Sequence, residues 1–127
     1  MTKGQLEAKI SEIVSKFEVV YLGRGPKTIR AHIMGDMIVV RMVCYMSPGD
    51  RKLASSKKGI ELLKATAVHL FEEGRDQLIT MLKDAFDIHI ISTHMDLSTQ
   101  TGEKIIILSL KDDLEMKIKN NASVSVF

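Results

Sequence analysis

The stretch Thr28-Ile-Arg-Ala-His-Ile-Met34-Gly35-Asp36-Met37-Ile-Val-Val-Arg-Met-Val-Cys-Tyr-Met46 decides the fold. It predicts two strands, 28–34 and 37–46, joined by the two-residue turn Gly35-Asp36. Glycine at the first central position suits a type II′ hairpin. Such a loop fixes the strand register, so Met34 faces Met37 and the numbers of every facing pair sum to 71.

This register divides the hairpin into two unlike faces. One face is wholly apolar and is expected to lie under helices; it carries Ile29, Ala31, Ile33, Ile38, Val40, Met42 and Cys44. The opposite face places Arg30 directly across from Arg41, and like charges in that position repel. Three interpretations stay open: solvated arginines that splay apart, an acidic partner from the second hairpin or another subunit, or a small-anion site.

Helices are predicted on both sides of the hairpin. A capping box at Thr2 and Gln5 starts a helix over about residues 3–21. Its apolar stripe has helical spacing and comprises Leu6, Ile10, Ile13, Val14, Phe17, Val20 and Tyr21. After the hairpin, Ser47-Pro48 is a helix start. We expect a short helix or a kink there, then a long helix to about residue 86. On that helix, Gly74 is expected to allow close packing against the first helix or the sheet.

A second strand pair is predicted at residues 88–97 and 103–110. Its run Ile105-Ile106-Ile107-Leu108 is apolar on both sides, as in a strand that is covered on both faces. Helices on one face of the sheet would leave the outer isoleucines bare. We therefore predict a homodimer, or contact with another partner, through the outer face of the sheet.

The predicted order is helix, strand, strand, helix, strand, strand. Antiparallel hairpins with helices on one face make a two-layer α+β sandwich. The strand order across the middle of the sheet is not predicted. We expect a single domain over residues 1–110 and a weakly structured C-terminal extension over residues 111–127. The alternating tail 123–127 is expected either to be disordered or to add an edge strand.

The densest polar cluster follows the third strand and comprises His94, Asp96, Ser98, Thr99, Thr101 and Glu103. His94 and Asp96 share one strand face, so they suit a general base with its orienting acid, or two metal ligands with His32 as the third. Alternatively, Asp96 and the hydroxyl groups bond the backbone of their own turn, with Lys104 opposite Asp96. Contact with a partner or an anion also stays open.

The segment Gly23-Arg24-Gly25-Pro26 ends the first helix. Gly25 lets the backbone approach a neighbour, and Arg24 offers a planar fork of donors to a partner or an anion. A plain helix stop with a solvated arginine is the alternative. The segment is not a phosphate-binding loop, because the lysine, the hydroxyl residue and the helix that should follow are missing.

Composition excludes several classes of function. Eighteen basic and sixteen acidic residues give a net charge of +2, too balanced to indicate nucleic-acid binding. With no Trp, two Tyr and four Phe, a base-stacking platform is not expected.

The lone Cys44 is expected to be a buried structural thiol. No apolar run reaches the ~20 residues of a membrane span, which favours a cytoplasmic protein. Nothing matches a nucleophile elbow or a cofactor or metal motif, so we expect no enzyme, cofactor or metal.

Four motifs together carry a family resemblance: Met1-Thr-Lys-Gly-Gln-Leu-Glu7, Tyr21-x-Gly23-Arg24-Gly25-Pro26, Gly35-Asp36-Met37, and His94-x-Asp96-x-Ser98-Thr99-x-Thr101-Gly102-Glu103. Over about residues 1–110 the chain resembles a bacterial family named after the C component (MpsC-like) of a proposed sodium-translocating, membrane-potential-generating system. The resemblance implies a soluble protein associated with a membrane ion- or bicarbonate-handling system. It implies no catalytic residues.

Three hypotheses follow. The first is a non-enzymatic, dimeric accessory or regulatory protein that contacts a partner through a polar edge formed by the Arg24 loop and the turn at residues 94–103. The second is a small-anion binding or sensing protein that uses Arg24, Arg30 or Arg41. The third is a metal-assisted enzyme that uses His94, Asp96 and His32.

Overall fold

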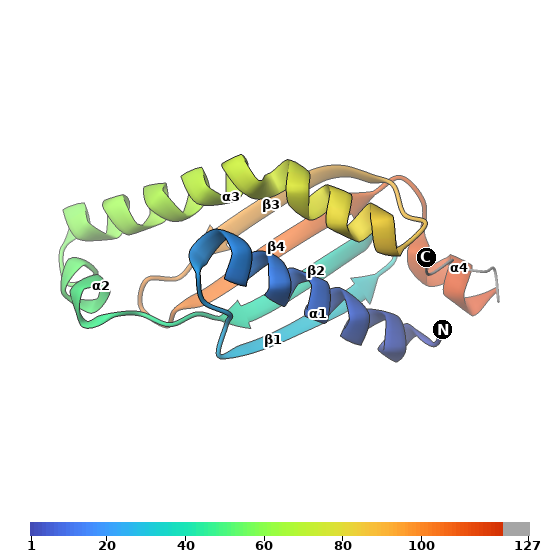
Figure 1. Cartoon of the computed structure of the whole chain (residues 1–127), viewed down its shortest axis with the longest axis horizontal. Coiled ribbons are helices and arrows are strands. Elements are labelled where there is room, and N and C mark those ends of the chain that lie inside the picture. Colours follow the sequence, from blue (N-terminus) through green and yellow to red (C-terminus); the bar gives the residue numbers. More distant parts are fainter. Residues whose placement is uncertain (121–127) are drawn as a thin grey trace.

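The computed structural model describes residues 1–120 as two layers, with two long helices on one face of a four-stranded antiparallel sheet (Figure 1). This confirms the predicted α+β sandwich. The elements are α1 (Lys3–Leu22), β1 (Thr28–Met34), β2 (Met37–Val43), α2 (Pro48–Leu53), α3 (Lys57–Ala85), β3 (Ile90–Leu97), β4 (Glu103–Leu110) and α4 (Leu114–Lys119). No helix among residues 1–120 is both long and apolar enough to cross a membrane.

The strands lie in the order β1-β2-β4-β3, so the two hairpins meet through their second strands. The predicted register of the first hairpin is confirmed: Arg30 faces Arg41 and Met34 faces Met37. Gly35 has a φ of +61°, the left-handed region that a primed hairpin turn requires at this position.

Helix α1 begins with the predicted capping box and ends at Gly23, whose φ is +74°. Its buried residues are Leu6, Ile10, Val14, Phe17 and Glu18. The prediction for Val20 is wrong, because this side chain is 63% exposed. In the last turns the face of α1 that meets the rest of the protein passes through Phe17, Glu18 and Tyr21, and it includes a charged residue.

The two long helices touch at Gly74 of α3. A Cβ atom there would lie 2.8 Å from Cζ of Phe17 and 3.1 Å from Cδ1 of Tyr21, so only glycine admits α1 at this distance. The predicted role of Gly74 in close packing is confirmed. The second half of α3 buries Leu78 and Leu82 over the sheet. Its first half reaches past the sheet and lies over α2 (Figure 1).

The end of the sandwich with the turn Gly35-Asp36, helix α4 and the last turn of α3, here named the closed end, is filled with apolar side chains. Phe86, Leu110 and Leu114 are at most 3% exposed. Residues 114–119 of the predicted extension thus form a helix that packs against the domain. The predicted tail strand 123–127 lies outside the described residues.

The outer edge of β1 is hydrogen-bonded by side chains. The N–H groups of Ala31 and Ile33 donate to Ser11 Oγ at 2.9 Å and to Glu7 Oε2 at 2.8 Å, both on α1. The Gly35 N–H donates to Glu115 Oε1 of α4 at 3.1 Å. An edge whose donors are already bonded does not add another strand easily, so β1 is protected against strand pairing.

The face of the sheet that points away from the helices, here named the outer face, is not covered by any element of residues 1–120 (Figure 1). Ile106 and Leu108 of β4 point under the helices and are buried. Their neighbours Ile105 and Ile107 point outward and stay partly exposed. The structure thus leaves on this face the bare apolar residues that the sequence predicted.

Candidate functional site

Three connections meet at the end of the sheet opposite the closed end: 23–27, 44–47 and 98–102. We name this region the loop end. The Lys27 N–H donates to the Val43 carbonyl, and the Cys44 N–H donates to the Gly102 carbonyl, each with an N···O distance of 2.8 Å. The segment 44–47 therefore lies between the two predicted polar loops. The structure brings those loops to one end of the fold, where they flank a common segment.

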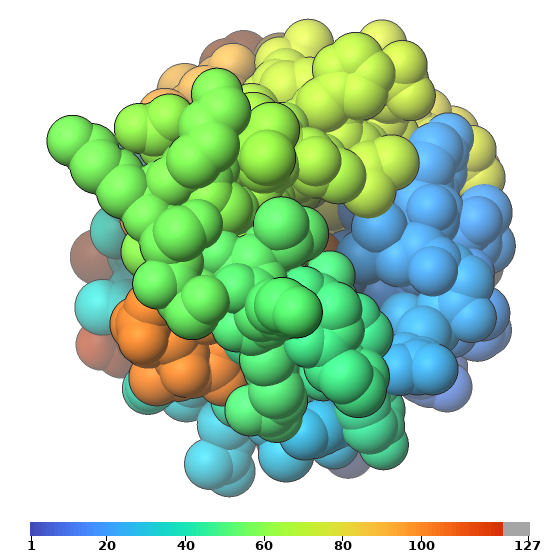
Figure 2. Space-filling model, turned by 90° about the vertical axis from the view of Figure 1, so that its left-hand side faces the viewer, coloured from blue at the N-terminus to red at the C-terminus, as the bar shows by residue number. Residues whose placement is uncertain are grey.

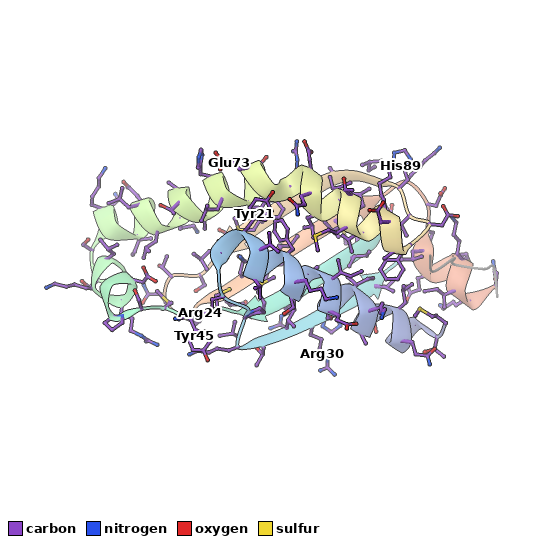
Figure 3. All side chains as sticks on the ribbon, viewed as in Figure 1. Tyr21, Arg24, Arg30, Tyr45, Glu73 and His89 are labelled. Carbon is purple, nitrogen blue, oxygen red and sulfur yellow. The ribbon has the colours of Figure 1, made fainter. Side chains whose placement is uncertain are left out.

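The Arg24 side chain lies over the ring of Tyr45, with 4.7 Å from its guanidinium carbon to the ring centroid. Lys27 lies over the same ring, 4.8 Å from Nζ to the centroid. Figure 3 shows Arg24 beside Tyr45, whereas Arg30 projects from β1 into solvent. A Cβ atom on Gly25 would make only ordinary contacts with α1, at 3.4 Å or more. The loop therefore presents two cations on one aromatic ring.

The turn after β3 is built by its own hydrogen bonds, as one of the alternatives predicted. Asp96 Oδ1 accepts from the Leu97 N–H at 2.8 Å. Ser98 Oγ accepts from the Thr101 N–H at 3.4 Å, and Thr101 Oγ1 accepts from the Glu103 N–H at 3.2 Å. Thr99 is 7% exposed, and its side chain makes no hydrogen bond within residues 1–120. The hydroxyl groups of Ser98 and Thr101 thus already accept hydrogen bonds from the backbone.

Asp96 also has a partner from the helical layer. Lys64 of α3 reaches Asp96 with an Nζ···Oδ1 distance of 3.0 Å. This hydrogen bond, together with that from the Leu97 N–H, holds the pKa of the Asp96 carboxyl below its usual value. The expected position of Lys104 opposite Asp96 is wrong. Lys104 faces Leu97 instead. In this register the Lys104 side chain points to the face of the sheet that the helices cover.

On the outer face, the two opposed arginines have an acidic neighbour from the second hairpin. Arg41 Nη2 lies 3.1 Å from Glu103 Oε2, on the adjacent strand β4. Of the interpretations left open, this supports the acidic partner from the second hairpin for Arg41. Arg30 has no ion pair within residues 1–120 and lies beside Arg41 in a shallow surface depression.

The histidines of the metal hypothesis are far apart. His32, Val39, Ile107 and His94 form one row across the four strands, with His32 and His94 at opposite edges. Three strand spacings separate the two histidines by about 14 Å, too far to share one ion. Within residues 1–120, no three His, Cys, Asp or Glu side chains are grouped to hold a metal. Instead, Nε2 of His94 lies 3.4 Å from Oγ of Ser92.

A buried ion pair joins α1 and β4 and was not predicted from the sequence. Lys104 Nζ of β4 donates to Glu18 Oε1 of α1, and the two residues are 7% and 2% exposed. Each residue stands at a position where the periodicity of its helix or strand predicts a buried side chain. Glu18 follows Val14 by four residues on the α1 stripe, and Lys104 alternates with the buried Ile106 and Leu108. The signal available in the sequence was a charged residue at a position where the periodicity predicts a buried one.

The ion pair borders a cavity of about 340 Å³ at the loop end. Its walls come from the last turns of α1, from α2, from the first half of α3 and from the ends of the sheet. They are mainly apolar and include Phe17, Leu53, Leu63, Ala67, Leu70 and Phe71. Figure 2 looks onto this end of the molecule and shows a hollow where the surfaces of α1, α2 and α3 meet.

Cys44 lies in the wall of this cavity, so the expected structural thiol is only partly buried. Burial raises the pKa of the Cys44 thiol, which keeps it in the less reactive protonated form at neutral pH. No other cysteine exists in the chain. The thiol therefore contributes apolar surface to the cavity and gives it a single chemical marker.

The family is established by sequence. Residues 2–112 match the family model described as "Na+-translocating membrane potential-generating system (MpsC)". The uncharacterized protein YbcI of Bacillus subtilis (strain 168) is 32% identical over 118 residues, covering 93% of this chain and 95% of the relative. No solved structure matches the chain. The predicted resemblance is thereby confirmed, and the chain belongs to the MpsC family.

Proposed function

We propose that this protein is a non-enzymatic accessory or regulatory protein that acts by contact, as a homodimer formed through the outer face. The observation that carries the proposal is the uncovered apolar centre of that face, formed by Val39, Ile105 and Ile107. Contiguous apolar surface of this kind is typical of protein interfaces. We also propose a cytoplasmic location, as expected from the sequence.

The charges on the outer face favour a second copy of the chain as the occupant. Arg30 and Arg41 lie on the side of the first hairpin, and Asp96 and Glu103 lie on the side of the second. A two-fold axis that lies in the interface and runs parallel to the strands through the apolar centre brings the basic half of one copy onto the acidic half of the other. Arg30, which has no ion pair within residues 1–120, then meets acidic groups of the other copy that are already bonded to Arg41 and Lys64 of their own chain.

The polar edge at the loop end is then the surface for a different protein. The family description names a membrane-potential-generating system, and we propose that a protein of such a membrane ion- or bicarbonate-handling system is the partner. Arg24 and Lys27, held on the Tyr45 ring, offer a basic site beside the hydrogen-bonded turn 98–102. Such a site suits an acidic segment of the partner.

The experiment is a pull-down from a detergent-solubilised membrane fraction with the tagged full chain. We expect capture of a membrane protein by the wild type and a clear loss with Arg24→Ala. Lys58→Ala is the matched control, because it removes a basic side chain at an exposed position of α3. Equal capture by Arg24→Ala and the wild type would exclude the Arg24 loop as the contact.

Small-anion binding or sensing is the second candidate function, favoured by the positions of Arg30 and Arg41 directly across from each other on β1 and β2. Glu103 competes with an anion for Arg41, since the two side chains already form an ion pair. Bicarbonate, carboxylates and phosphate at millimolar concentrations should then raise the melting temperature of the wild type and leave that of Arg41→Ala unchanged. A melting temperature that no anion raises would remove this candidate.

A further inference from the structure

The cavity at the loop end combines an apolar wall with a charged pair. Its volume of about 340 Å³ is within the range of small-molecule sites, about 300–1,000 Å³. One water molecule takes up about 30 Å³ of the liquid, so this space is large enough for a small organic molecule and not only for single waters. The apolar side chains of α1, α2 and α3 form most of the wall, so most of an occupant must be apolar as well.

The two charged residues have hydrogen-bonding capacity left over. A lysine ammonium group has three donors, and Lys104 uses one of them for Glu18. Within residues 1–120 the Lys104 ammonium makes no other hydrogen bond, and the second carboxylate oxygen of Glu18 accepts none. Buried charged groups are stabilised when their remaining donors and acceptors are bonded. The pair therefore favours an occupant whose polar group both donates and accepts.

The charge balance restricts that polar group further. Lys104 and Glu18 neutralise each other, so a charged head group would be buried without a counter-charge of its own. We propose that the cavity binds a small uncharged amphiphile, with its apolar chain or ring against α3 and its hydroxyl or amide group bonded to Lys104 and Glu18. This site is separate from the outer face and does not depend on the function proposed above.

The test compares three probes that share one apolar chain: 1-octanol, octanoate and octylammonium. Each is titrated into the ¹⁵N-labelled full chain and followed by amide chemical shifts. We expect 1-octanol to shift the amides of cavity residues such as Leu63, Ala67 and Gly102. Its binding should be at least about tenfold tighter than that of either charged probe. No shift at the solubility limit of octanol, or tighter binding of a charged probe, would overturn the proposal.

Two substitutions on neighbouring positions of α3 test the location. Ala67 lines the cavity, whereas Ala65 is exposed and does not. Ala67→Phe fills the space and should abolish the shifts caused by 1-octanol. Ala65→Phe adds the same side chain outside the cavity and should bind the probe as the wild type does. Octanol binding that survives in Ala67→Phe would place the site elsewhere and overturn the proposal.

The role of the ion pair is tested by Glu18→Met/Lys104→Met, which replaces both charges by apolar groups of similar size. Such double replacements usually fold as well as the charged parent. We expect octanol binding to weaken about tenfold, as for the loss of hydrogen bonds to charged groups. The preference over octylammonium and octanoate should also fall. Unchanged affinity for octanol in the folded double variant would show that its hydroxyl does not bond the pair.

The lone thiol gives an independent readout. Because Cys44 lies in the cavity wall, an occupant should slow its reaction with N-ethylmaleimide. Saturating 1-octanol should reduce the rate at least about threefold in the wild type and leave it unchanged in Ala67→Phe, whose cavity is already filled. Equal rates with and without octanol in the wild type would contradict an occupant in this cavity.

Discussion

The two ends of this sandwich complete its core in different ways. At the closed end, Phe86 and Leu114 fill the space between the sheet and the helices and are 1% and 3% exposed. At the loop end, the space between the sheet and the helices instead holds the ion pair of Glu18 and Lys104, beside a cavity. Well-packed apolar side chains stabilise a fold, whereas a cavity and buried charges reduce its stability. The difference assigns the closed end to stability and the loop end to recognition.

Truncation of one large side chain at each end gives the largest expected contrast. Phe86→Ala should lower the free energy of unfolding by about 3–5 kcal/mol, because it opens a hole in a packed region. Leu62→Ala, in the cavity wall at 47% exposure, should lower it by about 1 kcal/mol or less. Urea unfolding at one fixed protein concentration measures both. Equal losses would show that the first half of α3 is packed as tightly as the closed end.

Separation of the buried ion pair is expected to have the next largest effect. Lys104→Met leaves the Glu18 carboxylate buried without its cation and should cost about 3 kcal/mol of unfolding free energy. The double variant Glu18→Met/Lys104→Met should regain most of that loss. A double variant as unstable as Lys104→Met would show that the charges at the loop end are needed for the fold itself.

The glycines of the two hairpin turns allow a matched comparison. Gly35 and Gly102 have positive φ values of +61° and +78°. A Cβ atom at Gly35 meets its nearest neighbour at 3.9 Å, whereas one at Gly102 would lie 2.8 Å from the Cys44 carbonyl oxygen. Gly35→Ala should therefore cost about 1 kcal/mol and Gly102→Ala about 2 kcal/mol in urea unfolding. An equal cost would mean that the contact between 44 and 102 can relax.

The smallest expected effect concerns pH at the closed end. The hydrogen bond from Lys3, followed by that from the Gly35 N–H, holds the pKa of the Glu115 carboxyl below its usual value. A carboxyl whose pKa is lowered in the folded state stabilises the protein above its unfolded pKa, and this contribution is lost as pH falls through the folded pKa. Glu115→Gln should thus be less stable than the wild type at pH 7, and the difference should shrink in acid. A difference independent of pH would contradict this assignment.

Local rules were sufficient for the turn and register of the first hairpin and for the helix ends, but the predicted strand 37–46 is too long, because β2 ends at Val43. The two-residue turn at Gly35 sets the register of β1 and β2, and Gly74 marks the helix contact through the absence of a side chain. The strand order β1-β2-β4-β3 depends on how the two hairpins pair, which no local pattern specifies. That order brings Lys104 under Glu18, so the ion pair and the cavity beside it were not predictable from either segment alone.

The candidate site was therefore predicted only in part. The sequence located both polar loops, and the structure places them at one end because β1 and β4 begin there. It also offered the bonding of Asp96 and the turn hydroxyls to backbone N–H groups as one alternative, but it did not indicate the contact between Lys64 and Asp96. The turn bonds join residues at most three apart and are local, whereas the Lys64 contact depends on the passage of α3 beside β3, which is a tertiary feature.

The molar mass in solution, from sedimentation equilibrium over a range of protein concentrations, decides whether the outer face joins two copies of the chain. We expect a wild-type dimer of about twice 14.2 kDa. Ile107→Lys on the outer face should give a folded monomer, whereas Val68→Lys, at an exposed position of α3, should stay dimeric. A wild type that is monomeric at every concentration, or an Ile107→Lys variant that remains a dimer, would contradict the outer face as the contact surface.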